Sequence, residues 1–230
     1  MPMLSEMLSR VGYFTESSAD ALAEAVSAAR ERSVHAGETV VTEGEPCEGL
    51  FVVLEGRVRV VKISAEGREQ VLLILGPGRT FNDVPVFDEG VNPSNVEALE
   101  DGSVAVIPGA VMQTLMKRHP AIAVAAVRIL ASRLRMMTLM VENLAFKDVV
   151  GRVANVIKGC ADGNQPLVEG VPHACAHITQ QELAALTGSV REVVQRALKT
   201  LERAGAIRCG RARIEILDPN ILEDWAAAAI

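Results

Sequence analysis

Residues 179–205 read TQQELAALTGSVREVVQRALKTLERAG, and this stretch decides the fold of the C-terminal part of the chain. Thr179 and Glu182 have the spacing of a capping box, in which a hydroxyl and a carboxylate satisfy the first free amides of a helix. Ser189 and Glu192 repeat that spacing after a glycine-containing turn. Two capped helices joined by such a short turn are typical of a helix-turn-helix motif.

The second predicted helix separates apolar from polar residues. Its inward side is aliphatic, and its other side carries Arg191, Glu192, Gln195, Arg196 and Lys199. An arginine fork matches guanine O6 and N7, and a glutamate accepts a hydrogen bond from cytosine N4. The pattern therefore predicts a recognition helix, although a helical hairpin with a solvated charged face has the same spacing.

The charge distribution favours DNA binding over a solvated hairpin. Residues 191–213 contain seven Lys and Arg but two Glu, whereas the 230-residue chain has 23 Lys and Arg against 29 Asp and Glu. A basic island in an acidic protein is the expected footprint of phosphate binding. We expect Lys199 and Arg211 to contact phosphates, since Arg211 lies near the tip of a predicted two-stranded wing, residues 206–217.

Length and composition restrict the class of protein. A chain of 230 residues favours two domains. No apolar run of 18 residues and no signal peptide stand out, so we expect no membrane segment. The four cysteines, Cys47, Cys160, Cys175 and Cys209, have no paired spacing, which favours a reducing cytoplasm over a disulfide framework. No nucleophile–base pair, phosphate-binding glycine loop or carboxylate pair indicates an enzyme.

The remaining segments predict an α+β protein. The first 31 residues indicate two helical pieces. In residues 33–107, alternating polar and apolar residues and short apolar runs are interrupted by glycines at near-regular intervals, which is typical of an antiparallel barrel or roll. Residues 111–144 predict one long helix that Pro120 could interrupt, and residues 146–157 predict another helix. The expected parts are a roll with N-terminal helices at 1–110, a dimerisation helix at 111–145 and a winged helix-turn-helix domain at 146–230.

The long helix carries a heptad of apolar residues, which is the signature of helix pairing. The predicted dimer seam contains Val127, Leu130, Leu134, Met137, Val141 and Leu144. A second stripe, formed by Ile122, Ala126, Ile129, Met136 and Met140, is expected to lie on the roll. A single buried helix would also be apolar on two sides. A helix-turn-helix protein normally reads two half-sites, which favours the dimer.

The order of these parts resembles the cyclic-AMP receptor / fumarate–nitrate reduction regulator family. The resemblance rests on HAGETVVTEGEPCEGLFVVLEGRVRV, VENLAFKDVVGRVANVI, TQQELAALTG and VREVVQRALKTLERAGAI. It implies a cyclic-nucleotide-binding-like β-roll (jelly roll), a cytoplasmic homodimer, a palindromic operator and contact with RNA polymerase. It also implies base reading by Arg191, Glu192 and Arg196, with Gln195 variable, and phosphate contacts at Thr179, Gln181 and Ser189.

The sequence departs from the resemblance at the effector pocket. Asn82-Asp83-Val84 stands where cyclic-nucleotide-binding members have Gly-Glu-Leu, and Pro93-Ser94 stands where they have an arginine followed by a small residue. Proline cannot replace an arginine fork, and an unpaired Asp83 would repel a phosphate. Met137 and Thr138 are expected to line the same pocket. We therefore expect an effector other than cyclic AMP, or none.

Three other sensing chemistries have less support in the sequence. The dispersed cysteines argue against an iron–sulfur cluster. Haem would need an axial ligand such as His35 or His119; the methionine-rich walls leave a haem-, gas- or redox-responsive sensor open as an alternative, although no motif supports it. His173, Cys175 and His177 could bind a metal with Cys160 as a fourth ligand, but a single extended strand cannot bring three of them to one ion without a turn. The sequence therefore requires no cofactor and no metal.

Overall fold

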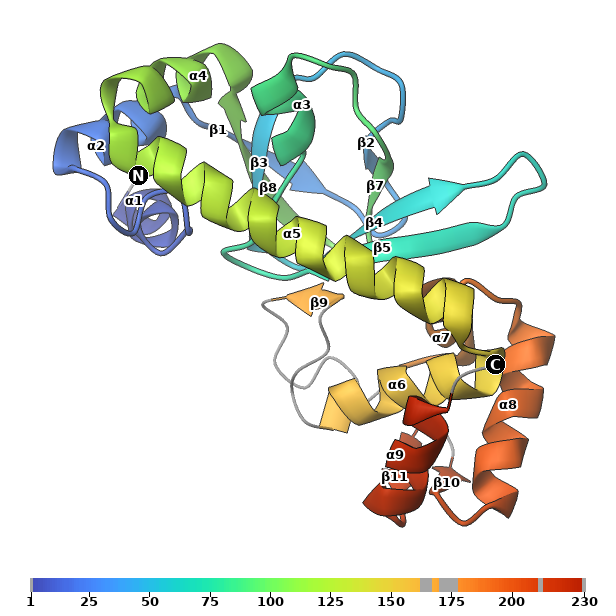
Figure 1. Cartoon of the computed structure of the whole chain (residues 1–230). Helices are drawn as coiled ribbons and strands as arrows, with labels where there is room; N and C mark the ends of the chain where they lie inside the picture. Colours follow the sequence, from blue (N-terminus) through green and yellow to red (C-terminus); the bar gives the residue numbers. More distant parts are fainter. Residues whose placement is uncertain (1, 162–166, 170–177, 211–212, 229–230) are drawn as a thin grey trace. The chain divides into compact units, whose positions relative to one another are not determined.

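The computed structural model of the chain describes residues 2–161, 167–169, 178–210 and 213–228 (Figure 1). The chain divides into two compact units, and each is described by itself. The first comprises residues 1–61 and 73–135, and the second comprises residues 62–72 and 136–230. Both mix helices with strands, so the predicted α+β class is confirmed.

The strands of the N-terminal part form an antiparallel roll. They are β1 (Arg30–Val34), β2 (Thr39–Val41), β3 (Gly49–Glu55), β4 (Val58–Ile63), β5 (Glu69–Leu75), β6 (Thr80–Phe81), β7 (Asn95–Ala98) and β8 (Gly102–Pro108). One sheet has the order β1-β8-β3-β6. The other has the order β2-β7-β4-β5-β9, where β9 is Val168–Glu169. The predicted roll is therefore confirmed.

Two glycines allow the strands of the first sheet to pack closely. Gly49 begins β3, and a Cβ atom there would lie 2.2 Å from the carbonyl oxygen of Ile107 in β8. Gly102 begins β8, and a Cβ atom there would lie 2.2 Å from the carbonyl oxygen of Glu55. Any larger residue at either position would push the two strands apart.

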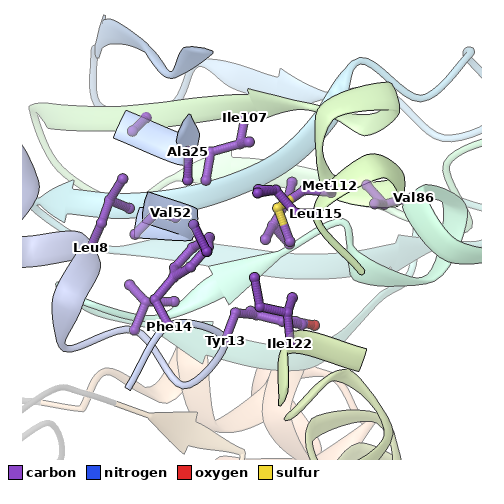
Figure 2. Close-up of a cluster of buried hydrophobic side chains, with 14 of the residues drawn as sticks. Leu8, Tyr13, Phe14, Ala25, Val52, Val86, Ile107, Met112, Leu115 and Ile122 are labelled. Atoms are coloured by element: carbon purple, nitrogen blue, oxygen red, sulfur yellow. The ribbon is translucent and has the colours of Figure 1, made fainter. Parts of the chain in front are cut away.

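Helices cover this sheet and complete the core of the first unit. They are α1 (Pro2–Ser9), α2 (Ala19–Ala28), α3 (Asp83–Asp88), α4 (Gly109–Arg118) and the first part of α5 (Pro120–Phe146). Figure 2 shows Leu8 and Phe14 from the N-terminal segment together with Met112 and Leu115 from α4 and Val52 from β3. All five are almost completely buried, so residues from distant parts of the chain share one apolar cluster.

The second unit contains the end of α5 and the C-terminal elements. These are α6 (Val149–Ala161), α7 (Gln180–Thr187), α8 (Arg191–Arg203), β10 (Ile207–Gly210), β11 (Arg213–Ile216) and α9 (Pro219–Ala227). Apolar residues of α6, α7 and α8, such as Val153, Leu183 and Leu201, are fully buried. Asp218 caps α9, since its carboxylate accepts from the amides of Asn220 at 2.8 Å and Ile221 at 3.3 Å. The predicted two-stranded wing is confirmed by the pairing of β10 with β11.

The structure settles the helix boundaries in this part of the chain. The interruption that the sequence allowed at Pro120 is present: residues 111–144 fall in two helices, α4 and α5, because the chain leaves the helical conformation at His119. The predicted helix at 146–157 begins at Val149 and extends to Ala161, beyond Gly159. None of the described helices is long and apolar enough to cross a membrane.

Candidate nucleic-acid interface and effector pocket

The first helix of the motif begins as its sequence predicts. Thr179 Oγ1 accepts from the amide of Glu182 at 3.1 Å, and the amide of Thr179 donates to Glu182 Oε2 at 2.7 Å. The capping box is therefore confirmed. Gly188 ends α7 in the left-handed conformation, with φ 60°, which glycine adopts without strain.

Side chains from outside the motif bind the last carbonyls of α7. Gln70 Nε2, in β5, lies 3.3 Å from the carbonyl oxygen of Ala185 and 3.4 Å from that of Leu186. Arg152 Nε, in α6, donates to the carbonyl oxygen of Thr187 at 2.8 Å. A helix end leaves four carbonyls without intrahelical partners, so these donors stabilise the turn between α7 and α8.

Helix α8 starts one residue later than the sequence predicts. Its N-cap is Val190, whose side chain makes no capping bond, and not Ser189. The reason is that the amide of Ser189 still donates to the carbonyl of Ala184 and so belongs to the end of α7. The carbonyl of Val190 then accepts from the amides of Val193 and Val194.

The two faces of α8 are as expected. Val194, Ala197, Leu198 and Leu201 are buried. The residues predicted to read or bind DNA from this helix, Arg191, Glu192, Gln195, Arg196 and Lys199, are all exposed. Their arrangement on one open helical surface has the geometry that a major groove admits.

The predicted phosphate contacts are only partly described. Thr179 and Gln181 are exposed at the start of α7, and Ser189 is half-buried in the turn. Arg211 lies outside the described residues. Arg208 in β10 pairs with Glu215 in β11, with 3.6 Å between Nη1 and Oε2. The contacts of all these residues with DNA stay predictions.

The effector region holds a buried carboxylate that is fully paired. Asp83, at the start of α3, is 1% exposed. Its Oδ1 accepts from the Tyr13 hydroxyl at 2.6 Å and the Thr80 hydroxyl at 3.0 Å, and its Oδ2 pairs with Arg133 of α5. Arg133 also donates to the Thr80 carbonyl. Asp83 is therefore paired, and a cation from a distant helix neutralises it.

Arg133 and Tyr13 are the members of this network that sequence reasoning missed. A signal for Arg133 exists, because position 133 falls within the buried stripe of Ile122, Ala126 and Ile129. A cation at a buried helical position requires a partner of opposite charge. Burial raises the pKa of the Tyr13 hydroxyl, and the nearby charge of Arg133 opposes this effect. Tyr13 therefore remains a neutral donor to Asp83.

The other predicted pocket residues differ in environment. Asn82 has φ 64° and its Nδ2 donates to the carbonyl of Gly49 at 3.2 Å. Val84 and Pro93 are exposed, whereas Ser94 is buried. Met137 is half-buried and Thr138 is exposed. These two belong to the second unit, while the others lie in the first.

The predicted dimer seam is an exposed apolar stripe on α5. Val127, Leu134 and Val141 are 67%, 68% and 65% exposed. Leu144 is also exposed, and Leu130 and Met137 are half-buried. Ile122 and Ala126 of the second stripe join the core of the first unit, with Ile129 packed against it, as predicted. Exposed apolar stripes of this kind are found at protein–protein interfaces, and pairing along this one stays a prediction.

Only some of the candidate sensing residues lie in the part of the chain that the structure describes. His35 is exposed beside Asp101, and His119 lies between α4 and α5. His173, Cys175 and His177 lie outside the described residues. Cys160 is disulfide-bonded, contrary to the expectation of free thiols, so in this state it offers no thiolate to a metal. Cys47 and Cys209 are free, and burial raises the pKa of both thiols.

Comparisons with known proteins match both parts of the chain. Residues 31–119 match the cyclic nucleotide-binding domain family, and residues 151–225 match the Crp-like helix-turn-helix domain family. The cyclic AMP receptor protein of Thermus thermophilus is 31% identical over 203 residues, which cover 88% of this chain and 90% of that protein. A CRP-like cAMP-activated global transcriptional regulator of Mycobacterium tuberculosis is 29% identical, over 95% of this chain and 98% of the relative.

A solved structure has a similar fold. The c-di-GMP-responsive global regulator CLP of Xanthomonas campestris superposes with a TM-score of 0.74 and 23% identity. The superposition covers 87% of this chain and 100% of that one. At this identity the likeness supports the fold alone.

Proposed function

Because the chain belongs to the cyclic-AMP receptor protein / fumarate–nitrate reduction regulator family, whose members regulate transcription through a helix-turn-helix domain, we propose how this member does so. It acts in the cytoplasm as a homodimer on a palindromic operator, and it does not use cyclic AMP. The observation that carries the effector part of this proposal is the pairing of Asp83 with Arg133, together with Pro93 in the position of the family's phosphate-binding arginine.

Operator reading is assigned to α8. The exposed Arg191 and Arg196 suit guanine O6 and N7, Glu192 suits cytosine N4, and Gln195 suits adenine. Lys199 and the wing residue Arg211 are assigned to phosphates, as are Thr179, Gln181 and Ser189. The excess of positive charge in this segment supplies sequence-independent affinity, and the base contacts supply discrimination.

The homodimer is assigned to the α5 stripe. A helix-turn-helix monomer covers one half-site, and two half-sites about one DNA turn apart require a second copy. Val127, Leu134 and Val141 would be buried in a parallel pairing of two α5 helices. Each large aliphatic side chain that moves from water into such an interface contributes about 1.5–3 kcal/mol before association costs.

Independence from cyclic AMP follows from the chemistry of the roll pocket. A cyclic phosphate needs a cation when it leaves water, because an unpaired buried charge is costly. Pro93 stands in place of the family's arginine, and Arg133 is already paired with Asp83. The relatives do not decide the effector, since one is described as cAMP-activated and a structural neighbour as c-di-GMP-responsive.

A calorimetric titration tests the effector proposal. The full chain should show no saturable heat with cyclic AMP up to about 100 μM, and its operator affinity should not change when cyclic AMP is added. The same titration with the Thermus thermophilus relative is a positive control for the ligand. Micromolar binding that also tightens operator affinity would contradict the proposal. Contact with RNA polymerase is expected from the family and can be tested by transcription in vitro from an operator-bearing promoter.

A further inference from the structure

A cavity in the second unit has no role in the proposed function. It has a volume of about 350 Å³ and is lined by the C-terminal half of α5, helix α6 and the end of α7. This size is within the range of sites that hold small organic molecules. Its walls combine two kinds of chemistry.

The lining contains both apolar and charged side chains. Met140 and Leu144 of α5, Val156 of α6 and Leu186 of α7 are among its apolar lining residues. The charged lining residues are Lys147, Arg152, Lys158 and Glu142, so three cations face one carboxylate. An elongated ligand with an apolar body and a negative group would match both kinds of side chain.

Arg152 is the cation best placed for such a ligand. Its Nε donates to the carbonyl of Thr187 and its Nη1 to the carbonyl of Lys147, both at 2.8 Å. Among the described residues, its Nη2 has no hydrogen-bond partner. Burial lowers the pKa of this guanidinium, and the charge of Asp148 opposes the shift. A partly desolvated guanidinium with a free edge favours an anion that can accept two hydrogen bonds.

Two nearby carboxylates, Asp148 and Glu223, each have another partner. Asp148 Oδ1 accepts from the amide of Gly151 at 2.8 Å, and Glu223 of α9 pairs with Lys158. Lys147 Nζ donates to the carbonyl of Ala226 at 2.6 Å. Arg152 therefore keeps an Nη2 group without a partner among the described residues, while the Lys147 and Lys158 ammonium groups are each drawn to a partner on the C-terminal segment.

We propose that this cavity binds a small organic anion with an apolar body, such as a medium-chain carboxylate, whose carboxylate contacts Arg152. The site is separate from the pocket of the roll. Arg152 connects the carbonyl of Lys147, at the α5–α6 junction, with the carbonyl of Thr187, at the turn of the DNA-binding motif. A bound anion would therefore change operator affinity, and this second statement rests on the proposed function.

Calorimetry with octanoate and 1-octanol tests the ligand chemistry, because the two probes share a chain and differ in charge. The full-length protein should bind one octanoate per chain, with a dissociation constant of roughly 0.1–1 mM for a ligand of this size. Binding of 1-octanol should be at least tenfold weaker. Equal affinity for both probes, or no saturable octanoate binding, overturns the proposal.

A matched pair of variants tests the residue. Arg152→Gln should reduce octanoate affinity to the level of 1-octanol. Arg128→Gln, which removes an exposed cation of α5 outside the cavity, should leave octanoate affinity unchanged. Equal losses in the two variants would show an effect of net charge and overturn the assignment to Arg152.

Photolabelling of the unmutated protein locates the site and does not depend on how the variants fold. A diazirine analogue of octanoate should label peptides from residues 136–159. Labelling confined to residues 30–119 overturns the proposal. Operator titration with saturating octanoate separates the two hypotheses. Unchanged operator affinity overturns the coupling alone, while octanoate binding without any operator binding contradicts the proposed function alone.

Discussion

The buried pair of Asp83 and Arg133 makes a strong prediction about stability. Replacement of Arg133 by Met removes the cation but keeps an unbranched apolar stem. Asp83, at 1% exposed, then retains only the hydroxyls of Tyr13 and Thr80 as hydrogen-bond donors among the described contacts. Breaking a buried pair in this way typically costs about 3–5 kcal/mol. We expect the first unit to lose that much stability.

The measurement must separate the two units. Hydrogen exchange by mass spectrometry can report the opening free energy of peptides from β3 and β8. Trp225, the one tryptophan of the chain, lies in α9 of the second unit, so its fluorescence transition in urea should change little.

A matched control exists on the same helix. Arg128 pairs with Glu16 at 3.1 Å, and both side chains are about two-thirds exposed. Arg128→Met should therefore cost about 0–1 kcal/mol. Adding Asp83→Asn to Arg133→Met should restore part of the loss, because the unpaired charge is gone. A cost below about 1 kcal/mol for Arg133→Met would refute the account of this network.

Three further substitutions test other parts of the account. Arg196→Ala should weaken operator binding by about 1–3 kcal/mol and barely change binding to random duplex, as measured by fluorescence anisotropy; equal losses on both would identify a phosphate contact. Leu134→Glu would bury a carboxylate between two α5 helices, so sedimentation should show monomers with weak operator affinity; a persistent dimer would place the interface elsewhere. Gln70→Ala removes a donor from the end of α7 and should destabilise the second unit by about 1 kcal/mol, seen in the urea transition of Trp225; an unchanged midpoint would show that the contact is not stabilising.

Local signals in the sequence predicted the DNA-binding motif well. The capping box at Thr179 and Glu182, the glycine at 188 and the two faces of α8 all depend on residues within one or two helical turns. Such patterns act through neighbouring backbone amides and side chains, so they can be read without knowledge of the fold. The start of α8 was missed because the end of α7 had already engaged the amide of Ser189.

The effector region was predicted less well because its contacts are long-range. Asp83 and Arg133 are 50 residues apart, and Tyr13 is 70 residues from Asp83. Nothing in the local sequence of Asp83 shows that it is paired. The cation within the buried stripe of α5 was the available signal, and it indicates that a partner exists without showing which one. The cavity lined by Arg152 is likewise formed by residues of three helices, so it cannot be recognised from the sequence of any one of them.

Selection of duplex DNA by the unmutated full-length protein, with no ligand added, tests the central claim most directly. The account predicts enrichment of a two-fold symmetric sequence with half-sites about one DNA turn apart, because two copies of α8 must read successive major grooves on one face. Enrichment that appears only when cyclic AMP is present, or retention of DNA without any sequence preference, would contradict it.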